Sequence, residues 1–173
     1  MAEQPAPGID LVPDGITAGV VAGAIMIVAL MLASFELGGT LEGPLRLVSS
    51  IILGPAALSR VYPFISAAVI GASLHFVLSA LYGVFFVTAL GWLGRLDVGA
   101  HRLLLTGAAF GAILWVTNYQ ILAAVFFPTF VVISPSWLGL LGHSIFFGIA
   151  LGLYVVLVKP GRARRRDGQA AAP

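Results

Sequence analysis

Apolar residues occur along the chain in four long runs, which short polar or helix-breaking segments separate. A helix needs about 20 apolar residues to cross the hydrocarbon core of a bilayer. The sequence predicts spans of that length at residues 16–35, 67–92, 103–127 and 137–158. Pro128 and Pro160 follow the third and fourth runs, where proline ends a helix without interrupting it. We therefore expect a single all-α membrane domain, with four transmembrane helices forming a bundle.

The segment between the first two runs is longer than a turn and carries a shorter apolar piece, at residues 41–60. This piece is too short and too interrupted to span. A helix on the outer interface and a shallow re-entrant piece both fit it. The apolar loop at residues 128–136 also fits an interfacial position.

Composition supports the membrane interpretation. Of the 173 residues 60% are hydrophobic and 9% are charged, whereas a soluble domain carries about 25% charged residues. Lipid must therefore cover much of the surface. The chain has no cysteine, which excludes disulfides, thiolate metal sites and cysteine nucleophiles.

The basic residues predict the orientation. Five of the nine lie in the tail at residues 159–173, and Arg95 and Arg102 lie between the second and third runs. Cytoplasmic loops of membrane proteins are enriched in Lys and Arg. Both termini are therefore predicted on the cytoplasmic side of a bacterial inner (plasma) membrane. The tail is interpreted as an anchor near anionic lipids, and no nucleic-acid partner is expected. No Lys or Arg precedes the first run, which favours a retained helix over a cleaved signal peptide.

Two short patterns each occur twice. The first and third runs share G-x-x-x-G-A-I, starting at Gly19 and Gly107. The second and fourth share G-x-x-x-H, ending at His75 and His143. The order predicts two tandem helical-hairpin repeats in parallel orientation, related by an axis along the membrane normal.

Small residues recur four positions apart, on one face of each helix. Lipid offers little hydrophobic drive for helix association, so close approach through glycine matters more. We expect the seam within the chain, or between copies in a homo-oligomer, at Gly15, Gly19, Gly23, Gly71, Gly83, Gly107, Gly111, Gly148 and Gly152.

Three segments resemble an uncharacterised bacterial family of four-helix integral membrane proteins, a domain family of unknown function. They are the glycine-rich opening at residues 15–23, the triplet at residues 74–76, and the segment at residues 142–154, in which Gly-His precedes a glycine-rich run. The resemblance covers most of residues 15–158. It implies four spans and brings no activity with it.

The polar residues of the spans fall at nearly one depth. A helix rises about 1.5 Å per residue, which places four of them roughly 23 to 26 Å from the cytoplasmic boundary. Polar groups inside a membrane are costly unless they face the bundle and find partners. The four are His75, His143, Asn118 and Gln120. Together with Tyr119 and Glu36 on the same side, they form the candidate polar layer.

Several interpretations of this layer remain open. In one, the imidazoles are structural and form hydrogen bonds between helices. Alternatively, His75 and His143 serve as the two axial ligands of a b-type haem. A quinone or a lipid head group bound near the histidines and Tyr119 is a third interpretation. A zinc site is not expected, because zinc normally takes three or four protein ligands.

The sequence contains no P-loop, no HExxH and no paired catalytic carboxylates, so no enzyme activity is expected. No Asp or Glu lies within the predicted spans, which disfavours a proton relay. The leading expectation is a non-enzymatic accessory subunit of a larger complex or a small oligomeric membrane protein. The alternative is a haem-, quinone- or small-ligand-binding protein. A small transporter is the third, supported only by the repeat.

Overall fold

The structure is a computed structural model that describes residues 9–96 and 98–158. Four helices in it are long and apolar enough to cross a membrane: Leu11–Glu36, Phe64–Trp92, Ala100–Phe126 and Ser136–Val158. The predicted all-α bundle of four apolar helices is therefore confirmed. The basic tail predicted at residues 159–173 lies outside the described residues.

The first two spans are single helices, α1 (Leu11–Glu36) and α3 (Phe64–Trp92). The other two change pitch near the middle. The third consists of α4 (Ala100–Trp115), the π-helical η2 (Val116–Ala123) and α5 (Ala124–Phe126). The fourth begins with α7 (Ser136–Leu141) and the π-helical η3 (Gly142–Ile149) and continues as α-helix to Val158.

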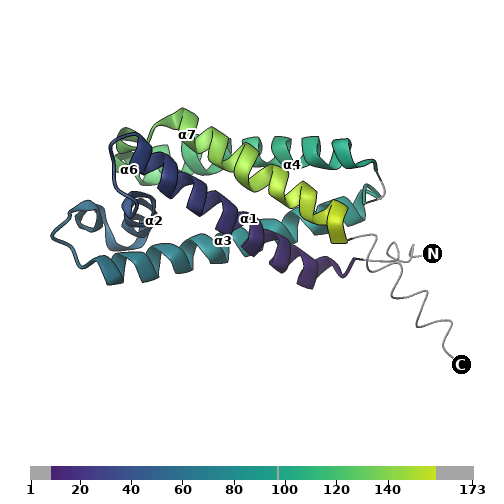
Figure 1. Cartoon of the computed structure of the whole chain (residues 1–173), viewed down its shortest axis with the longest axis horizontal. Coiled ribbons are helices and arrows are strands. Elements are labelled where there is room, and N and C mark those ends of the chain that lie inside the picture. Colours follow the sequence, from purple (N-terminus) through teal and green to yellow (C-terminus); the bar gives the residue numbers. More distant parts are fainter. Residues whose placement is uncertain (1–8, 97, 159–173) are drawn as a thin grey trace, which may run out of the picture.

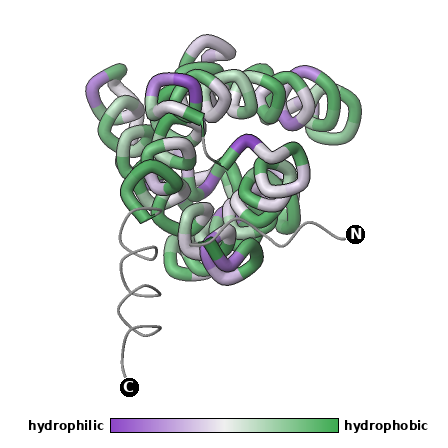
Figure 2. Tube along the Cα trace, turned by 90° about the vertical axis from the view of Figure 1, so that its right-hand side faces the viewer, coloured by the Kyte–Doolittle hydropathy of each residue, from purple (hydrophilic) through white to green (hydrophobic). Residues whose placement is uncertain are grey.

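The helices form two antiparallel hairpins that lie side by side (Figure 1). In one, α1 packs along α3, and in the other, α4 packs along η3. Contact between α1 and η3 joins the hairpins. The start of α1 and the end of the fourth helix lie at one end of the bundle, and α2 and α6 lie at the other. Apolar residues predominate around each long helix in Figure 2.

The first span begins five residues earlier than the apolar run suggests, and α1 therefore includes Asp14. This carboxylate is 1% exposed and accepts a hydrogen bond of 2.8 Å from the backbone N–H of Asp10. An acidic residue in the first turn is stabilised by the helix dipole. A carboxylate therefore lies within a long apolar helix, although no such group lies within the predicted span.

The segment between the first two spans folds into α2 (Gly43–Leu53) and the short 3₁₀ helix η1 (Pro55–Leu58). Arg46 of α2 is 5% exposed, and its Nη1 lies 3.0 to 3.2 Å from the carbonyl oxygens of Ala57, Ser59 and Tyr62. Its Nε bonds Glu42 at 2.8 Å. One buried guanidinium therefore holds the whole return loop against α2, because it supplies several donors to carbonyls that have no helical partner.

Glycines make the close approaches within each hairpin. A Cβ on Gly83 would collide with the backbone of Gly15, and one on Gly107 with the backbone of Gly148. Gly71 stands apart, because it faces the backbone of α2 at Leu45. All nine glycines assigned to packing from the sequence lie where another element of this chain approaches closely: Gly15, Gly19, Gly23, Gly71, Gly83, Gly107, Gly111, Gly148 and Gly152.

The two hairpins pack in a matching register. The second glycine of each G-x-x-x-G-A-I pattern meets the histidine of its partner helix: Gly23 meets the ring of His75, and Gly111 meets the backbone of His143. The corresponding glycines and histidines therefore face each other in both hairpins.

One turn further along, the register differs by one residue. Gly19 meets Ser79, four residues beyond the first histidine, whereas Gly107 meets Gly148, five residues beyond the second. A π turn holds about one residue more than an α turn, and η3 lies within this stretch. The offset therefore has a local cause, and the tandem repeat itself stays a prediction.

Candidate functional site

A cavity of about 770 Å³ lies between the hairpins, at the end of the bundle that carries α2. Its walls come from α1, α2 and α3 on one side and from η2, α6 (Pro128–Ile133), α7 and η3 on the other. Most of its lining is apolar, with leucine side chains from both hairpins and phenylalanine side chains from the second. Cavities of this size and character are typical of small-molecule sites.

The polar lining falls into two groups. Those contributed by the long helices are uncharged: Ser34, His75, Ser79, Tyr82, Asn118, Tyr119 and His143. The charged lining residues of the described chain all come from α2 and the loops beside it, and they are Glu42, Arg46 and Arg60. The part of the cavity within the spans is therefore polar in places but carries no formal charge.

His75 is fixed across the first hairpin. Its Nε2 lies 2.9 Å from the carbonyl oxygen of Gly23, and the residue is 9% exposed. A carbonyl oxygen only accepts hydrogen bonds, so in the neutral ring Nε2 carries the hydrogen and Nδ1 keeps a lone pair. A Cβ on Gly23 would collide with the side chain of Ser79 and only touch the ring. His75 therefore joins α3 to α1, as in the structural interpretation of the polar layer.

His143 is fixed within its own helix. Its Nδ1 lies 2.8 Å from the carbonyl oxygen of Gly139, one turn earlier. By the same argument Nδ1 carries the hydrogen, and Nε2 keeps the lone pair. The ring is half-buried and lines the cavity. The two histidines thus have opposite tautomers, and only His143 keeps Nε2, the less crowded ring nitrogen, as an acceptor.

Tyr82 and Asn118 connect the hairpins beside the cavity. The Tyr82 hydroxyl donates to Asn118 Oδ1 at 2.8 Å, which joins α3 to η2. The Tyr82 ring also meets the ring of Phe147 on η3 edge-on, with centroids 6.5 Å apart. Tyr82 is absent from the predicted layer. A signal existed, because His75, Ser79 and Tyr82 follow an i, i+4, i+7 stripe on one helix face.

Tyr119 makes contacts that hold neighbouring segments of the fold together. The residue is 3% exposed, and its hydroxyl contacts the carbonyl oxygens of Val131, at 3.2 Å, and of Ser134. Trp115, stacked on it, donates from Nε1 to the carbonyl of Ser136 at 3.1 Å. The pair therefore holds the segment around α6 over this end of the bundle.

The structure does not bring Gln120 and Glu36 into the cavity. Both side chains are exposed, and neither belongs to the lining found among the described residues. Counting residues from the membrane boundary gives the position of a residue along the helix axis. It does not give the direction of the side chain around that axis. Gln120 follows Asn118 by two positions, which turns it about 200° to another face of the helix.

Both π-helical segments lie at this cavity. Asn118 and Tyr119 belong to η2, and His143 belongs to η3. Single π turns inside longer helices are frequent at functional sites. The wider turns bring polar side chains to the cavity wall at positions that an ideal α-helical projection does not give.

The histidine pair does not fit a b-type haem held by two axial ligands. Each histidine would have to present a ring nitrogen with a free lone pair to one iron between them. His143 Nε2 is available, but His75 Nε2 is bonded to Gly23 against α1, which leaves only Nδ1, the more crowded nitrogen beside the ring's bond to Cβ. Within residues 9–96 and 98–158, no group of three or more His, Cys, Asp or Glu is arranged to hold a metal ion.

Comparison of the chain with models of protein families, with curated proteins and with solved structures gave no match. The fold and the cavity therefore define the class of molecule: a helical bundle of membrane-spanning character that encloses a largely apolar ligand-sized cavity. The resemblance to an uncharacterised four-helix family stays a prediction.

Proposed function

We propose that this chain is a non-enzymatic integral membrane protein that binds an amphipathic small molecule between its two hairpins. The observation that carries the proposal is the cavity of about 770 Å³, with apolar walls and a few uncharged polar groups. Ligand sites have this composition, because the apolar wall supplies affinity and the polar groups fix orientation.

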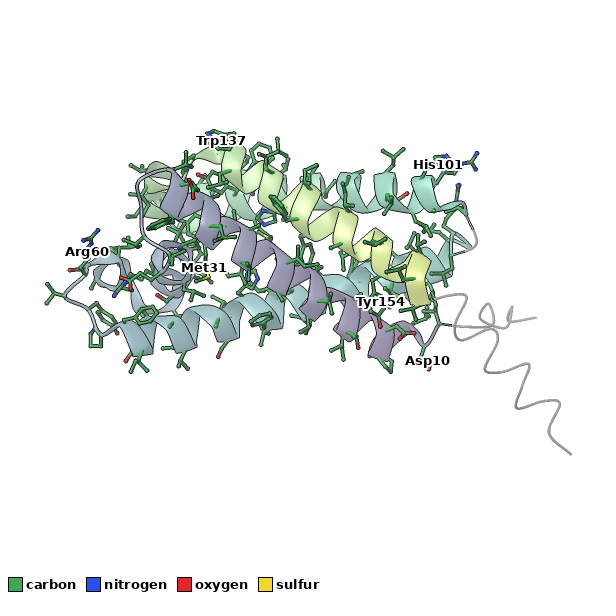
Figure 3. All side chains as sticks on the ribbon, viewed as in Figure 1. Asp10, Met31, Arg60, His101, Trp137 and Tyr154 are labelled. Atoms are coloured by element: carbon green, nitrogen blue, oxygen red, sulfur yellow. The ribbon has the colours of Figure 1, made fainter. Side chains whose placement is uncertain are left out.

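The proposed orientation places the cavity in the outer half of a bacterial inner membrane. Arg95 and Arg102 flank the start of α4, at the same end as the start of α1. Figure 3 shows His101, Asp10 and Tyr154 toward that end and Arg60 at the opposite end, where α2 lies. The basic tail at residues 159–173 follows the fourth helix at this end, so the sequence places seven Lys and Arg here against Arg46 and Arg60 at the other end. Under the positive-inside rule this end is cytoplasmic, so α2 and the cavity face outward.

Membership of a larger complex or a homo-oligomer is compatible with this proposal. The apolar residues exposed on the long helices fit lipid and a partner helix equally well. A transporter is supported by the matching register of the hairpins, since repeats of this kind underlie alternating access in other proteins. Neither alternative has a feature as specific as the cavity.

A pair of matched variants tests ligand binding. Leu78 and Leu81 lie on the same helix, but Leu78 lines the cavity, whereas Leu81 is 59% exposed on the outside of the bundle. The protein in liposomes is irradiated with increasing amounts of a photoreactive long-chain alcohol, and labelled residues are identified by mass spectrometry. We expect saturable labelling of cavity residues, which Leu78→Trp removes and Leu81→Trp preserves. Labelling that never saturates and is equal in both variants would refute the proposal.

A further inference from the structure

We infer that the head of the bound molecule is an uncharged hydroxyl group, held between His143 and Asn118. This inference rests on the proposed function and specifies its ligand: a neutral hydroxyl-bearing lipid, whether an alcohol or a phenol, with an apolar body that fills the rest of the cavity.

The hydrogen-bonding atoms left over in the cavity carry the inference. Because Nδ1–H of His143 donates to Gly139, its Nε2 offers only a lone pair. Because Asn118 Oδ1 already accepts from Tyr82, its amide nitrogen offers two N–H donors. The site therefore presents one acceptor and one donor group. A hydroxyl satisfies both, since it donates one hydrogen bond and accepts others.

The two groups lie on one stretch of the wall. Tyr82 is hydrogen-bonded to Asn118 and contacts the ring of Phe147, which is one helical turn beyond His143 on η3. All four residues line the same cavity. The inference places one head group beside Tyr82, within reach of both the acceptor and the donor.

Charge argues against an anionic head at this position. The lining from the long helices carries no formal charge among the described residues. The guanidinium of Arg46 is already committed to Glu42 and to three backbone carbonyls. Arg60 is exposed, in the return loop after η1. An anion beside His143 would be buried without a countercharge, which is strongly unfavourable.

Three photoreactive probes with one shared chain separate the head groups: a long-chain alcohol, its methyl ether and its phosphate monoester. The ether keeps the oxygen but loses the donor, so His143 Nε2 is left without a partner. We expect half-saturation of cavity labelling by the alcohol at a concentration on the order of 10-fold lower than by the ether. The phosphate is expected to label cavity residues most weakly.

Variants locate the preference. His143→Leu removes the acceptor and should abolish the preference for alcohol over ether while leaving ether labelling unchanged. Gln120→Leu, on an exposed face of η2, is the matched control and should keep the preference. Because the alcohol and the ether are first compared on the unmodified protein, the result does not depend on how well any variant folds.

The outcomes distinguish this inference from the function on which it rests. Equal labelling by alcohol and ether, or a preference that survives His143→Leu, would overturn the hydroxyl assignment and leave ligand binding intact. Strongest labelling by the phosphate, lost in Arg60→Gln, would also overturn it, in favour of an anionic head. If none of the three probes labels cavity residues saturably, the proposed function itself fails.

Discussion

The Nε2 atom of His75 lies 2.9 Å from the carbonyl oxygen of Gly23, so one imidazole joins two helices whose backbones are otherwise held together by glycines. The histidine supplies the donor, the backbone carbonyl of Gly23 accepts, and the missing Cβ of Gly23 leaves space for the side chain of Ser79. His143, at the corresponding position of the repeated G-x-x-x-H pattern, instead bonds a carbonyl of its own helix. The same residue type at corresponding positions therefore has a packing role in one hairpin and faces the cavity in the other.

The first prediction concerns this bond. Interhelical hydrogen bonds in membrane proteins contribute about 0.6 kcal/mol on average and up to about 1.7 kcal/mol. We expect His75→Leu to lower the free energy of unfolding in detergent by roughly 1 kcal/mol, with His101→Leu, on an exposed site of α4, as the control. Unfolding is followed by circular dichroism against denaturing detergent. Equal stability of His75→Leu and the unmodified protein would show that the bond contributes nothing.

The second prediction concerns the glycine seams. A methyl group on Gly19 or Gly107 would collide with backbone atoms of the facing helix, which cannot move aside as a side chain can. Overpacking of this kind costs about 1 to 3 kcal/mol. We expect Gly19→Ala and Gly107→Ala each to destabilise the bundle by about that amount. Gly99→Ala, whose methyl would meet only His101 at ordinary distance, should cost only the loss of glycine from the N-cap of α4 and no collision between helices. Unchanged thermal unfolding of both seam variants would contradict the packing described above.

The third prediction concerns the return loop after α2. Lysine carries the same charge as arginine but cannot supply the planar fork that reaches Glu42 and several carbonyls together. We expect amides around Ala57 to exchange hydrogen about 5- to 150-fold faster in Arg46→Lys, because leaving one buried carbonyl unpaired costs about 1 to 3 kcal/mol. Arg60→Lys, at an exposed position, is the control. Exchange that is slow in both variants would show that the loop is held by other contacts.

The fourth prediction addresses haem. Because Nε2 of His75 is bonded to Gly23, we expect protein produced with ample haem precursor to show no Soret band after purification. The measurement is a visible absorption spectrum, with a haem protein purified in the same detergent as positive control. A Soret band that disappears in both His75→Ala and His143→Ala would reverse this conclusion.

The fifth prediction tests the orientation. The chain has no cysteine, so single cysteines can be introduced without a background signal. In intact cells a membrane-impermeant maleimide should label Arg60→Cys, while His101→Cys should react only after permeabilisation. The opposite pattern would invert the bundle and place the cavity in the inner half of the membrane.

Much of the architecture could be predicted from the sequence, because membrane spans appear as long apolar runs that few other structures contain. The glycines could be read as well, since a spacing of four places them on one face. The start of α1 was harder to predict. Asp14 precedes the apolar run but lies inside the helix, because backbone hydrogen bonding already begins in a first turn that an acidic residue stabilises.

The site was recovered only in part, for a geometric reason. Counting residues from a boundary gave a common depth, and His75, Asn118, Tyr119 and His143 do line one cavity. Depth says nothing about direction around the axis, so Gln120 was grouped with them although it is exposed. The π turns add to the difficulty. They change the direction of every later side chain around the helix axis, and no residue type predicts where a π turn occurs.

The contact of α1 with η3 joins the earliest and the latest synthesised of the four described spans. At the far end of the same contact, the Tyr154 hydroxyl donates to Asp14 across a separation of 140 residues. The cavity has a wall from η3, so it does not exist until the fourth span has entered the membrane. A chain stalled after the third span would contain the α1–α3 hairpin but would lack the cavity for the proposed ligand.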